Sequence, residues 1–504
     1  MGVVFRQSIK TTIVIFLGAM LGALIIWLQT NYIGKQELGF VRQLTSYAVV
    51  GTQILLMGVQ NTISVYIHKY ADSKSKRGVL LAVSLLLPIV IIPISSIFYF
   101  AFKIDFIHVF FQPHDYPLIT RYFAWLPVFT VLMMYQVILE QFLISQVVVA
   151  LSSFVREVGL RAGNIIIILL FGFNAISFDT FIGATVLMYL IPLIVYLFIS
   201  AKTSGFALSL NFSAFSKEDI KDVIQFTWYH SLLSVSITLM GSLDTMMVGK
   251  LDKSGLISVA IYANAMFFIS ILQMPYKAMY NATFPVMAAA FKDNDMPKVQ
   301  DLFNRSSLNI IIGATIMAIL ILCNIGNAIA LMPAGYEMIK PLVAILVLGT
   351  FIDMAFGMNG QILSISQFYR FNFYGSIILV AVIVLLNFLL IPRIGGLGAA
   401  CSNSVGLILF NIAKYIFVRK RLDLQPFSRN TPLVLVAGLP AFAVGYFLPN
   451  FFNNIHHLYM GTFLDVAIRS GCIITIYLLM LLWLKPSPDL TQYIATIKKN
   501  KRLF

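Results

Sequence analysis

The sequence predicts an all-α polytopic membrane protein of about 14 transmembrane helices, arranged as two parallel six-helix lobes followed by two C-terminal helices. Of the 504 residues, 59% are hydrophobic and 11% are charged, and the mean hydropathy is +0.89. One soluble core could not use so much apolar sequence. The apolar residues also fall into runs of about 20, the length that crosses the hydrocarbon of a bilayer. Short matches repeat at one spacing along the chain, which indicates a duplicated half.

The first predicted lobe covers residues 1–200 and holds six helices. Its start, MGVVFRQSIK, leads directly into an apolar run without a small-residue cleavage site, so we expect a retained first helix and no removed signal peptide. The fifth helix begins in a polar segment around Arg156. The other five helices are predicted at 11–31, 40–68, 79–102, 118–139 and 181–200.

A polar linker, predicted to be cytoplasmic, separates the halves at 201–222. Within it, Ser216 and Asp219 have the spacing of a capping box ahead of an apolar run, so we expect a helix to begin there. The second lobe covers 223–420, and 421–504 contains two further helices and a basic tail. The later helices are predicted at two positions within 242–290 and at 308–331, 339–356, 374–390, 396–417, 433–448 and 462–484.

Two short matches lie at the same offset along the chain. The Gly-Lys pair at 34–35 joins two apolar runs, and the Gly-Lys pair at 249–250 does so again. Ile-Gly-Ala at 182–184 is followed, at an identical offset, by Leu-Gly-Ala at 397–399. Because six helices precede the linker, both halves enter the membrane from the same side, which makes the repeat parallel. Chance agreement between glycine-rich turns is the alternative explanation.

The positive charge is distributed as a topology signal. The formal net charge is +15, and most Lys and Arg residues lie in loops on one predicted side of the membrane. This bias predicts that both termini are cytoplasmic. Because the basic residues are spread over many short loops, no nucleic-acid partner is expected. The tail at 498–502 is expected to attract anionic membrane lipid.

Motifs for nucleotide hydrolysis and for metal binding are absent from the sequence. Neither Gly-Lys pair has the upstream glycine or the following Ser or Thr of a phosphate-binding loop, so a nucleotide-driven pump is not expected. The three cysteines lie in apolar runs without regular spacing, which argues against a disulfide framework and a metal site. Work must therefore come from a gradient or a partner, and Na⁺ or H⁺ is the coupling ion to consider.

Charged residues inside or next to the predicted helices are candidates for coupling or gating, because charge in hydrocarbon is costly and usually functional. Asp244 and Asp353 are the candidate ion-coupling carboxylates; pairing of Asp244 with a nearby Lys is the structural alternative. Glu157 and Arg161 lie four residues apart and can pair on one helix face. With Arg156 they predict an ion network beside a gate.

Three segments resemble a known family. The first is 242–290, which includes Asp244, Gly249, Gly255, Tyr262-Ala263 and Met274-Pro275. The others are FLGAMLGALIIWLQTNYIGKQELG at 16–39 and NFLLIPRIGGLGAA at 387–400. Together these segments resemble the multidrug, oligosaccharidyl-lipid and polysaccharide flippase superfamily, and the last is similar to the corner between helices 11 and 12 in its polysaccharide exporters. The likeness extends over nearly the whole chain.

The resemblance implies two lobes around a central cavity and transport by alternating access, without enzymatic activity. In the polysaccharide branch it implies flipping of undecaprenyl-diphosphate-linked oligosaccharide across a bacterial inner membrane, for surface polysaccharides such as the O-antigen of lipopolysaccharide. Partners would be that lipid-linked oligosaccharide, membrane lipid and other polysaccharide-assembly proteins. Lipid II flippases carry arginines in the first helix and after the Tyr-Ala motif; this chain has none at 11–31 and has Asn264 after that motif. The difference favours a glycan-repeat carrier.

The candidate substrate-binding residues are Lys277, Arg42, Tyr262 and Asn264. An Arg or Lys in the cavity would offset the desolvation of a diphosphate, and Arg can bind it with two parallel hydrogen bonds. Each cation also has an interfacial alternative, because Lys277 could extend its ammonium to the membrane surface and Arg42 lies near a helix end.

Three functions remain open at this stage. The lipid-linked glycan flippase agrees with the cationic residues and the motifs. A sodium- or proton-coupled multidrug exporter would need dominant cavity carboxylates, and acids inside helices are scarce. A membrane-embedded glycan polymerase would be expected to carry a large outer loop with acid and base residues, and the outer loops are short.

Overall fold

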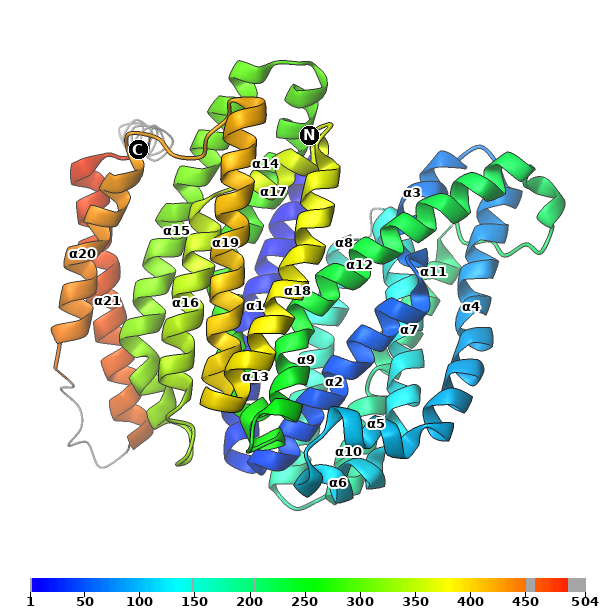
Figure 1. Cartoon of the computed structure of the whole chain (residues 1–504), viewed down its shortest axis with the longest axis horizontal. Coiled ribbons are helices and arrows are strands. Elements are labelled where there is room, and N and C mark those ends of the chain that lie inside the picture. The colour runs from blue at the N-terminus through cyan, green and yellow to red at the C-terminus, as the bar shows by residue number, and fades with distance from the viewer. Residues whose placement is uncertain (1, 147–148, 204, 450–457, 488–504) are drawn as a thin grey trace. The chain divides into compact units, whose positions relative to one another are not determined.

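The computed structural model describes residues 2–146, 149–203, 205–449 and 458–487, and every regular element in these ranges is a helix (Figure 1). The all-α prediction is therefore confirmed. By length and composition, eight described helices could cross a membrane, or up to eleven if each of three bent pairs forms one span. The predicted number of 14 is not confirmed. Helix α20 (Thr431–Phe447), for example, has only 17 residues, fewer than the about 20 that a span usually needs.

The chain forms two compact units, 1–260 and 261–504, with the boundary inside α13 (Leu256–Leu272). The first unit contains α1 (Gly2–Tyr32), α2 (Lys35–Leu56), α3 (Val59–Lys69), α4 (Lys74–Ala101), α5 (Lys103–Phe110), η1 (Pro113–Asp115), α6 (Tyr116–Tyr122), α7 (Trp125–Ser145), α8 (Val149–Phe154), η2 (Val155–Gly159), α9 (Leu160–Gly172), α10 (Phe178–Leu187), α11 (Leu190–Lys202), η3 (Phe212–Ala214) and α12 (Lys217–Leu251). The second contains α14 (Met274–Lys292), α15 (Met296–Ala330), α16 (Ile339–Ala355), α17 (Asn359–Ile365), α18 (Tyr369–Ile394), α19 (Gly396–Leu422), α20 and α21 (Leu458–Leu484).

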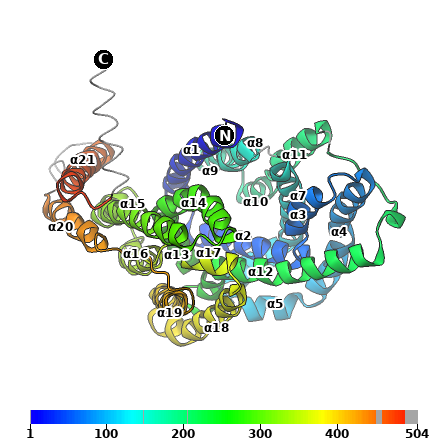
Figure 2. The same cartoon turned by 90° about the horizontal axis from the view of Figure 1, so that it is seen from above.

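Helix α12, the first after the linker, packs within the first unit. Ser216 caps it as the sequence predicts, because its hydroxyl accepts a hydrogen bond from the Asp219 backbone N–H at 3.0 Å. The helix then lies alongside α2 and α3 (Figures 1 and 2). The predicted lobes, 1–200 and 223–420, therefore do not coincide with the compact units, and their boundaries stay a prediction.

A break between α2 and α3 lets α12 approach. The predicted helix at 40–68 is bent by 47° at Met57 and Gly58, which both have positive φ. A Cβ on Gly58 would lie 2.5 Å from the Thr227 carbonyl oxygen and 2.6 Å from the Ser231 nitrogen, both on α12. Only glycine fits this close backbone crossing.

Helix boundaries recur at the offset of the sequence matches. The Gly-Lys pairs lie 215 residues apart, at 34–35 and 249–250. The helix that follows the break, α3, begins at Val59, and its counterpart α14 begins at Met274, at the same interval again. The second break bends α13 and α14 by 43°. This break lies directly before Pro275. The segment that carries Lys277 is therefore a separate helix, α14, and not a continuation of α13. These coincidences are what a duplicated half predicts.

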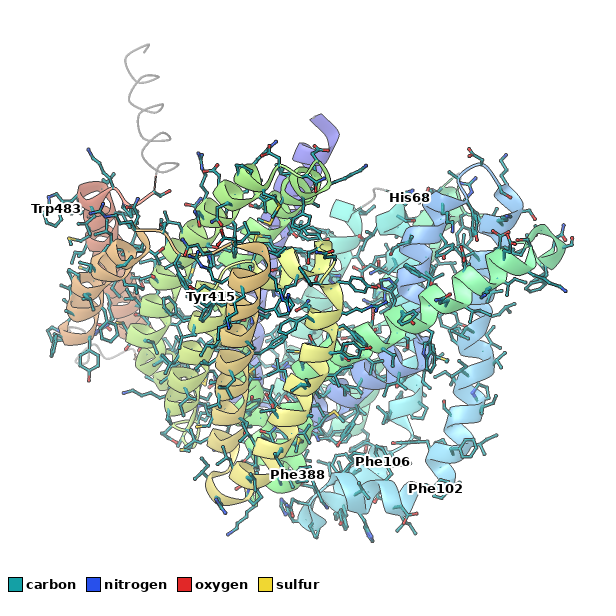
Figure 3. The ribbon with its side chains drawn as sticks, turned by 45° about the horizontal axis from the view of Figure 1, so that its top comes forward. His68, Phe102, Phe106, Phe388, Tyr415 and Trp483 are labelled. Atoms are coloured by element: carbon teal, nitrogen blue, oxygen red, sulfur yellow. The ribbon has the colours of Figure 1, made fainter. Side chains whose placement is uncertain are left out.

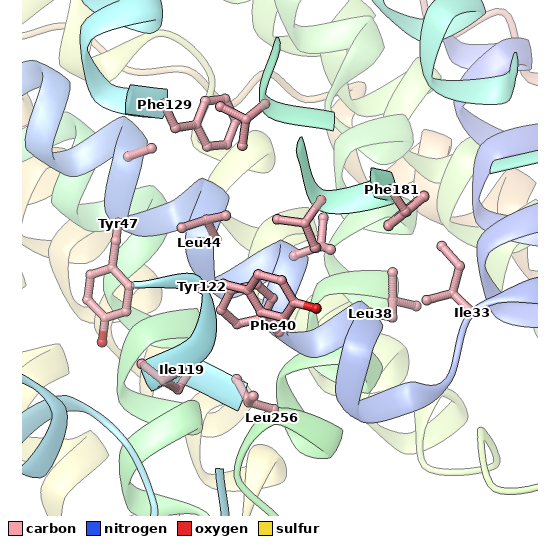
Figure 4. Close-up of a cluster of buried hydrophobic side chains, with 14 of the residues drawn as sticks. Ile33, Leu38, Phe40, Leu44, Tyr47, Ile119, Tyr122, Phe129, Phe181 and Leu256 are labelled. Atoms are coloured by element: carbon pink, nitrogen blue, oxygen red, sulfur yellow. The ribbon is translucent and has the colours of Figure 1, made fainter. Parts of the chain in front are cut away.

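Each unit has its own apolar core. In the first unit, Phe40 of α2 packs against Tyr122 of α6 with ring centroids 5.5 Å apart, and Leu256 lies in the same cluster (Figure 4). In the second unit, α20 and α21 pack on α15 through buried residues such as Ile311, Ala437 and Ile473. The two C-terminal helices that were predicted to lie outside the duplication, α20 and α21, therefore pack against α15.

Candidate functional site

An ion network in the first unit brings together the residues predicted to form a gate. Arg156 and Glu157 lie on η2, a π-helical segment between α8 and α9. Arg161 Nη2 lies 2.9 Å from Glu157 Oε2, which confirms the predicted pair. Arg156 Nε lies 3.2 Å from Glu157 Oε1. A π-helical turn displaces side chains relative to an α-helix and often marks a functional site.

Glu140 of α7, which was not among the predicted site residues, completes the network. Its Oε1 lies 2.5 Å from Arg156 Nη1, and its side chain is only 8% exposed. At the other end, Arg161 donates to the Gly18 carbonyl of α1. The network has two acids and two bases, so both arginines are compensated. In the sequence, Glu140 is marked only by its position at the end of an apolar run.

We expect Glu140→Gln to lower the free energy of unfolding by about 1–2 kcal/mol, because it leaves Arg156 with a single carboxylate. The expected loss is below the about 3–5 kcal/mol of a fully buried pair, because the Arg156 side chain is 44% exposed. Thermal unfolding in detergent measures the change. Glu218→Gln, on the exposed first turn of α12, is the matched control; an equal shift in both variants would contradict the prediction.

A second polar cluster lies in the second unit around Asp353 of α16. Asn411 of α19 donates to Asp353 Oδ1 at 2.5 Å. Lys414 lies three residues further along α19, on the same helix face as Asn411, beside Tyr415, which Figure 3 labels. Gln361 of α17 donates to the Tyr276 hydroxyl at 2.7 Å. Lys414 could not be selected from the sequence, because it lies near the end of α19 close to the basic residues Arg419, Lys420 and Arg421 and resembles another loop-side charge.

Lys277 lies in the first turn of α14, directly after the break at Gln273. Its side chain is exposed and has no ion-pair partner in the part of the chain that the structure describes. In contrast, the side chains of Tyr262 and Asn264 are fully buried on α13. The Asn264 amide forms no hydrogen bond within the described ranges. Among these three, only Lys277 is accessible in this conformation.

The remaining predicted residues, Arg42 and Asp244, belong to the first unit. Arg42 Nη2 donates to Gln29 Oε1 of α1 at 2.8 Å, so its guanidinium is held between two helices. Asp244 of α12 is 3% exposed and has a polar partner. Roles for all these residues in binding or coupling stay predictions.

Residues 108–115, which follow α4, form hydrogen bonds with the turn between α12 and α13. The sequence did not suggest this contact. Asp115 is fully buried, and it accepts hydrogen bonds from Leu256 N at 3.1 Å and Gln36 Nε2 at 2.8 Å. Lys250 donates to the carbonyls of His108 at 2.5 Å and Phe111 at 3.0 Å, at the end of α5. The Asp115 carboxylate thus lies at the positive N-terminal end of α13, and the Lys250 ammonium lies at the negative C-terminal end of α5. Phe106 of α5, labelled in Figure 3, packs edge-on against Tyr47 of α2 beside these contacts.

The fold is shared with solved transporters. The lipid II flippase MurJ in an inward closed conformation matches with a TM-score of 0.72 and 14% identity, over 96% of this chain and 100% of that chain. An inward-facing multidrug resistance MATE family transporter of the MOP superfamily matches with a TM-score of 0.65 and 16% identity, over 82% and 98%. A MOP superfamily transporter from Pyrococcus furiosus matches with a TM-score of 0.55 and 14% identity, over 83% and 96%.

These matches define a multi-pass membrane protein with the fold of the MOP superfamily. The family model described as "Polysaccharide biosynthesis protein" matches residues 4–291, more than half of the chain. The chain therefore belongs to the polysaccharide biosynthesis protein family. No curated protein matches the chain.

Proposed function

We propose that the protein is a secondary transporter that flips undecaprenyl-diphosphate-linked oligosaccharide from the cytoplasmic to the periplasmic leaflet of a bacterial inner membrane, with both termini in the cytoplasm. The glycan would serve a surface polysaccharide such as O-antigen. The observation that carries the proposal is membership of the polysaccharide biosynthesis protein family. The lipid II flippase fold adds support, because that relative transports a lipid-linked substrate across the same kind of barrier.

The exposed ammonium of Lys277 supports the diphosphate part of the proposal. A diphosphate cannot enter hydrocarbon without compensation of its charge. Lys277 lies at the start of α14, where the helix dipole also favours negative charge, and no described carboxylate neutralises it. The glycan would then follow the diphosphate while the undecaprenyl tail stays in the bilayer.

A sodium- or proton-coupled multidrug exporter is the second candidate, favoured by the MATE fold match. Against this candidate, the buried Glu140 is paired with Arg156, so it is not a free coupling carboxylate. Coupling by Na⁺ or H⁺ also remains a proposal for the flippase, with Asp353 and Asp244 as the residues to test.

The decisive experiment measures flipping of a fluorescent undecaprenyl-diphosphate oligosaccharide in proteoliposomes. We expect transport by the wild type and a loss of about tenfold or more in Lys277→Ala, because a charge-assisted hydrogen bond contributes about 1.5–3 kcal/mol. Lys292→Ala, in the exposed last turn of the same helix, is the control and should retain transport.

Two other results would change the assignment. Transport that is unchanged in Lys277→Ala would keep the flippase and remove the diphosphate role of this lysine. Efflux of organic cations driven by a sodium or proton gradient, with no flipping of any lipid-linked glycan, would favour the drug exporter.

A further inference from the structure

The break between α16 and α17 gathers polar side chains from several helices of the second unit. The two helices are bent by 46°, and Gly357 between them has a φ of +65°. Helices α14, α18 and α19 pack against α17 (Figures 1 and 2). Broken helices within transporters commonly form substrate sites. The polar residues at this break are Tyr276, Asp353, Asn359, Gln361, Asn372 and Lys414.

Short distances place most of these side chains next to one another. Gln361 Nε2 lies 2.7 Å from the Tyr276 hydroxyl, and Asn372 Nδ2 lies 3.3 Å from the Gly360 carbonyl. A Cβ built on Gly360 would lie 3.8 Å from both Lys414 Nζ and Asn372 Oδ1. The side chains of Gln361, Asn372 and Lys414 are half-buried. The cluster therefore reaches the surface of the second unit, where a ligand can meet it.

Much of the hydrogen-bonding capacity of this cluster is unused. Asn359 is 1% exposed, and neither atom of its amide has a hydrogen-bond partner in the described chain. Gln361 Oε1 is buried and accepts from no described donor. Lys414 Nζ lies 4.5 Å from the centroid of the Phe410 ring and donates to no acceptor within the same ranges. Because buried polar groups are normally hydrogen-bonded, these groups are available to a ligand.

The two charges of the cluster oppose each other, and its free groups include both donors and acceptors. The Lys414 ammonium lies within electrostatic range of the Asp353 carboxylate. Asp353 Oδ1 accepts from Asn411, whereas no described side chain donates to its Oδ2. A diphosphate would be attracted by Lys414 and repelled by Asp353, and the reverse holds for an organic cation. A sugar hydroxyl both donates and accepts, so an uncharged sugar matches this set of groups.

We propose that this cluster binds a sugar residue of the glycan through its hydroxyl groups. The inference rests on the function proposed above and adds a second contact to the same substrate, because Lys277 would hold the diphosphate and this cluster the glycan. A site built to hydrogen-bond hydroxyls discriminates against a ligand without them, since its polar groups then stay unpaired. The cluster therefore selects the glycosylated lipid over the bare lipid diphosphate.

Native mass spectrometry of the full chain tests this selection, with undecaprenyl diphosphate and undecaprenyl-diphosphate oligosaccharide supplied in equal amounts. We expect the wild type to bind the glycosylated lipid in excess by about tenfold, the ratio that one hydrogen bond to a charged group provides. Asn372→Leu should remove most of this excess and leave binding of the bare lipid unchanged. Asn324→Leu is the control, because this α15 amide bonds Ser470 on α21, and it should keep the excess.

A second variant separates glycan binding from folding. Asn359→Leu replaces an unpaired buried amide with an apolar side chain of similar volume, so the unliganded protein should unfold at the same or a higher temperature. The excess of glycosylated lipid should nevertheless fall. A lower unfolding temperature together with an unchanged excess would assign Asn359 to the fold and overturn its role in binding.

The competition also distinguishes this proposal from the function on which it rests. Equal binding of the two lipids by the wild type, or an unchanged excess in Asn372→Leu, would remove the glycan site and leave the flippase. Binding of neither lipid by the wild type would contradict the flippase itself.

Discussion

Arg469→Met is expected to lower the free energy of unfolding by about 3–5 kcal/mol, because it leaves the Asp465 carboxylate charged and buried without its partner. Asp465 and Arg469 lie one turn apart on α21, with side chains that are each 5% exposed and Nη2 3.1 Å from Oδ2. Arg469 Nη1 also donates to the Gly445 carbonyl of α20 at 2.6 Å. Asn327 of α15 donates to Asp465 at 2.6 Å. The pair therefore joins three helices inside the second unit.

Asp465→Leu combined with Arg469→Met should restore most of the lost stability, because both buried charges are removed together. Thermal unfolding in detergent compares the single and double variants. Arg305→Met is the matched control, since Arg305 and Asp301 form a pair of the same spacing on α15 with side chains 46% and 54% exposed. That control should lose less than about 1 kcal/mol. A double variant as unstable as Arg469→Met would argue that packing and not charge dominates at this position.

Gly39→Val is expected to separate α2 from the start of α13 and abolish the conformation described here. A Cβ at residue 39 would lie 1.7 Å from the Leu256 carbonyl oxygen, a distance that no rotamer change can relieve. Asp115 would then lose its hydrogen bond to Leu256 N, and Lys250 its contacts to α5. Under the function proposed above, we expect the loss of transport together with the opening of this region.

Labelling of a cysteine at Leu256, whose side chain is fully buried at the start of α13, measures the opening. In a background in which Cys323, Cys401 and Cys472 are replaced, Gly39→Val should raise the rate of reaction with a membrane-impermeant maleimide by about tenfold or more, the change that about 1.4 kcal/mol produces. Gly51→Ala on the same helix is the control, because its Cβ would meet only the Thr130 side chain at 3.6 Å. Equal labelling rates in Gly39→Val and Gly51→Ala would contradict the prediction that a side chain at residue 39 separates α2 from α13.

Several features followed from the sequence because they depend on neighbours along the chain. Hydrophobic run length predicts membrane helices, and the Ser216 cap and the Glu157 pair with Arg161 are local contacts within one helical turn. The recurrence of a helix start at Val59 and Met274 follows the constant offset of the Gly-Lys pairs. The number of spans could not be predicted as well, because helices such as α20 and the bent pairs do not match a uniform run of about 20 residues.

The all-helical membrane class, the repeated offset and the ends of several helices could be predicted from the sequence. Only the tertiary structure showed that Glu140 meets Arg156, that Asp465 joins three helices, and that Asp115 is buried at the start of α13. The contact at Gly58 is also tertiary, since the backbone there meets Thr227 and Ser231 of α12, which lie far along the chain. Hydropathy records how apolar each helix is, whereas these contacts depend on which faces of distant helices meet.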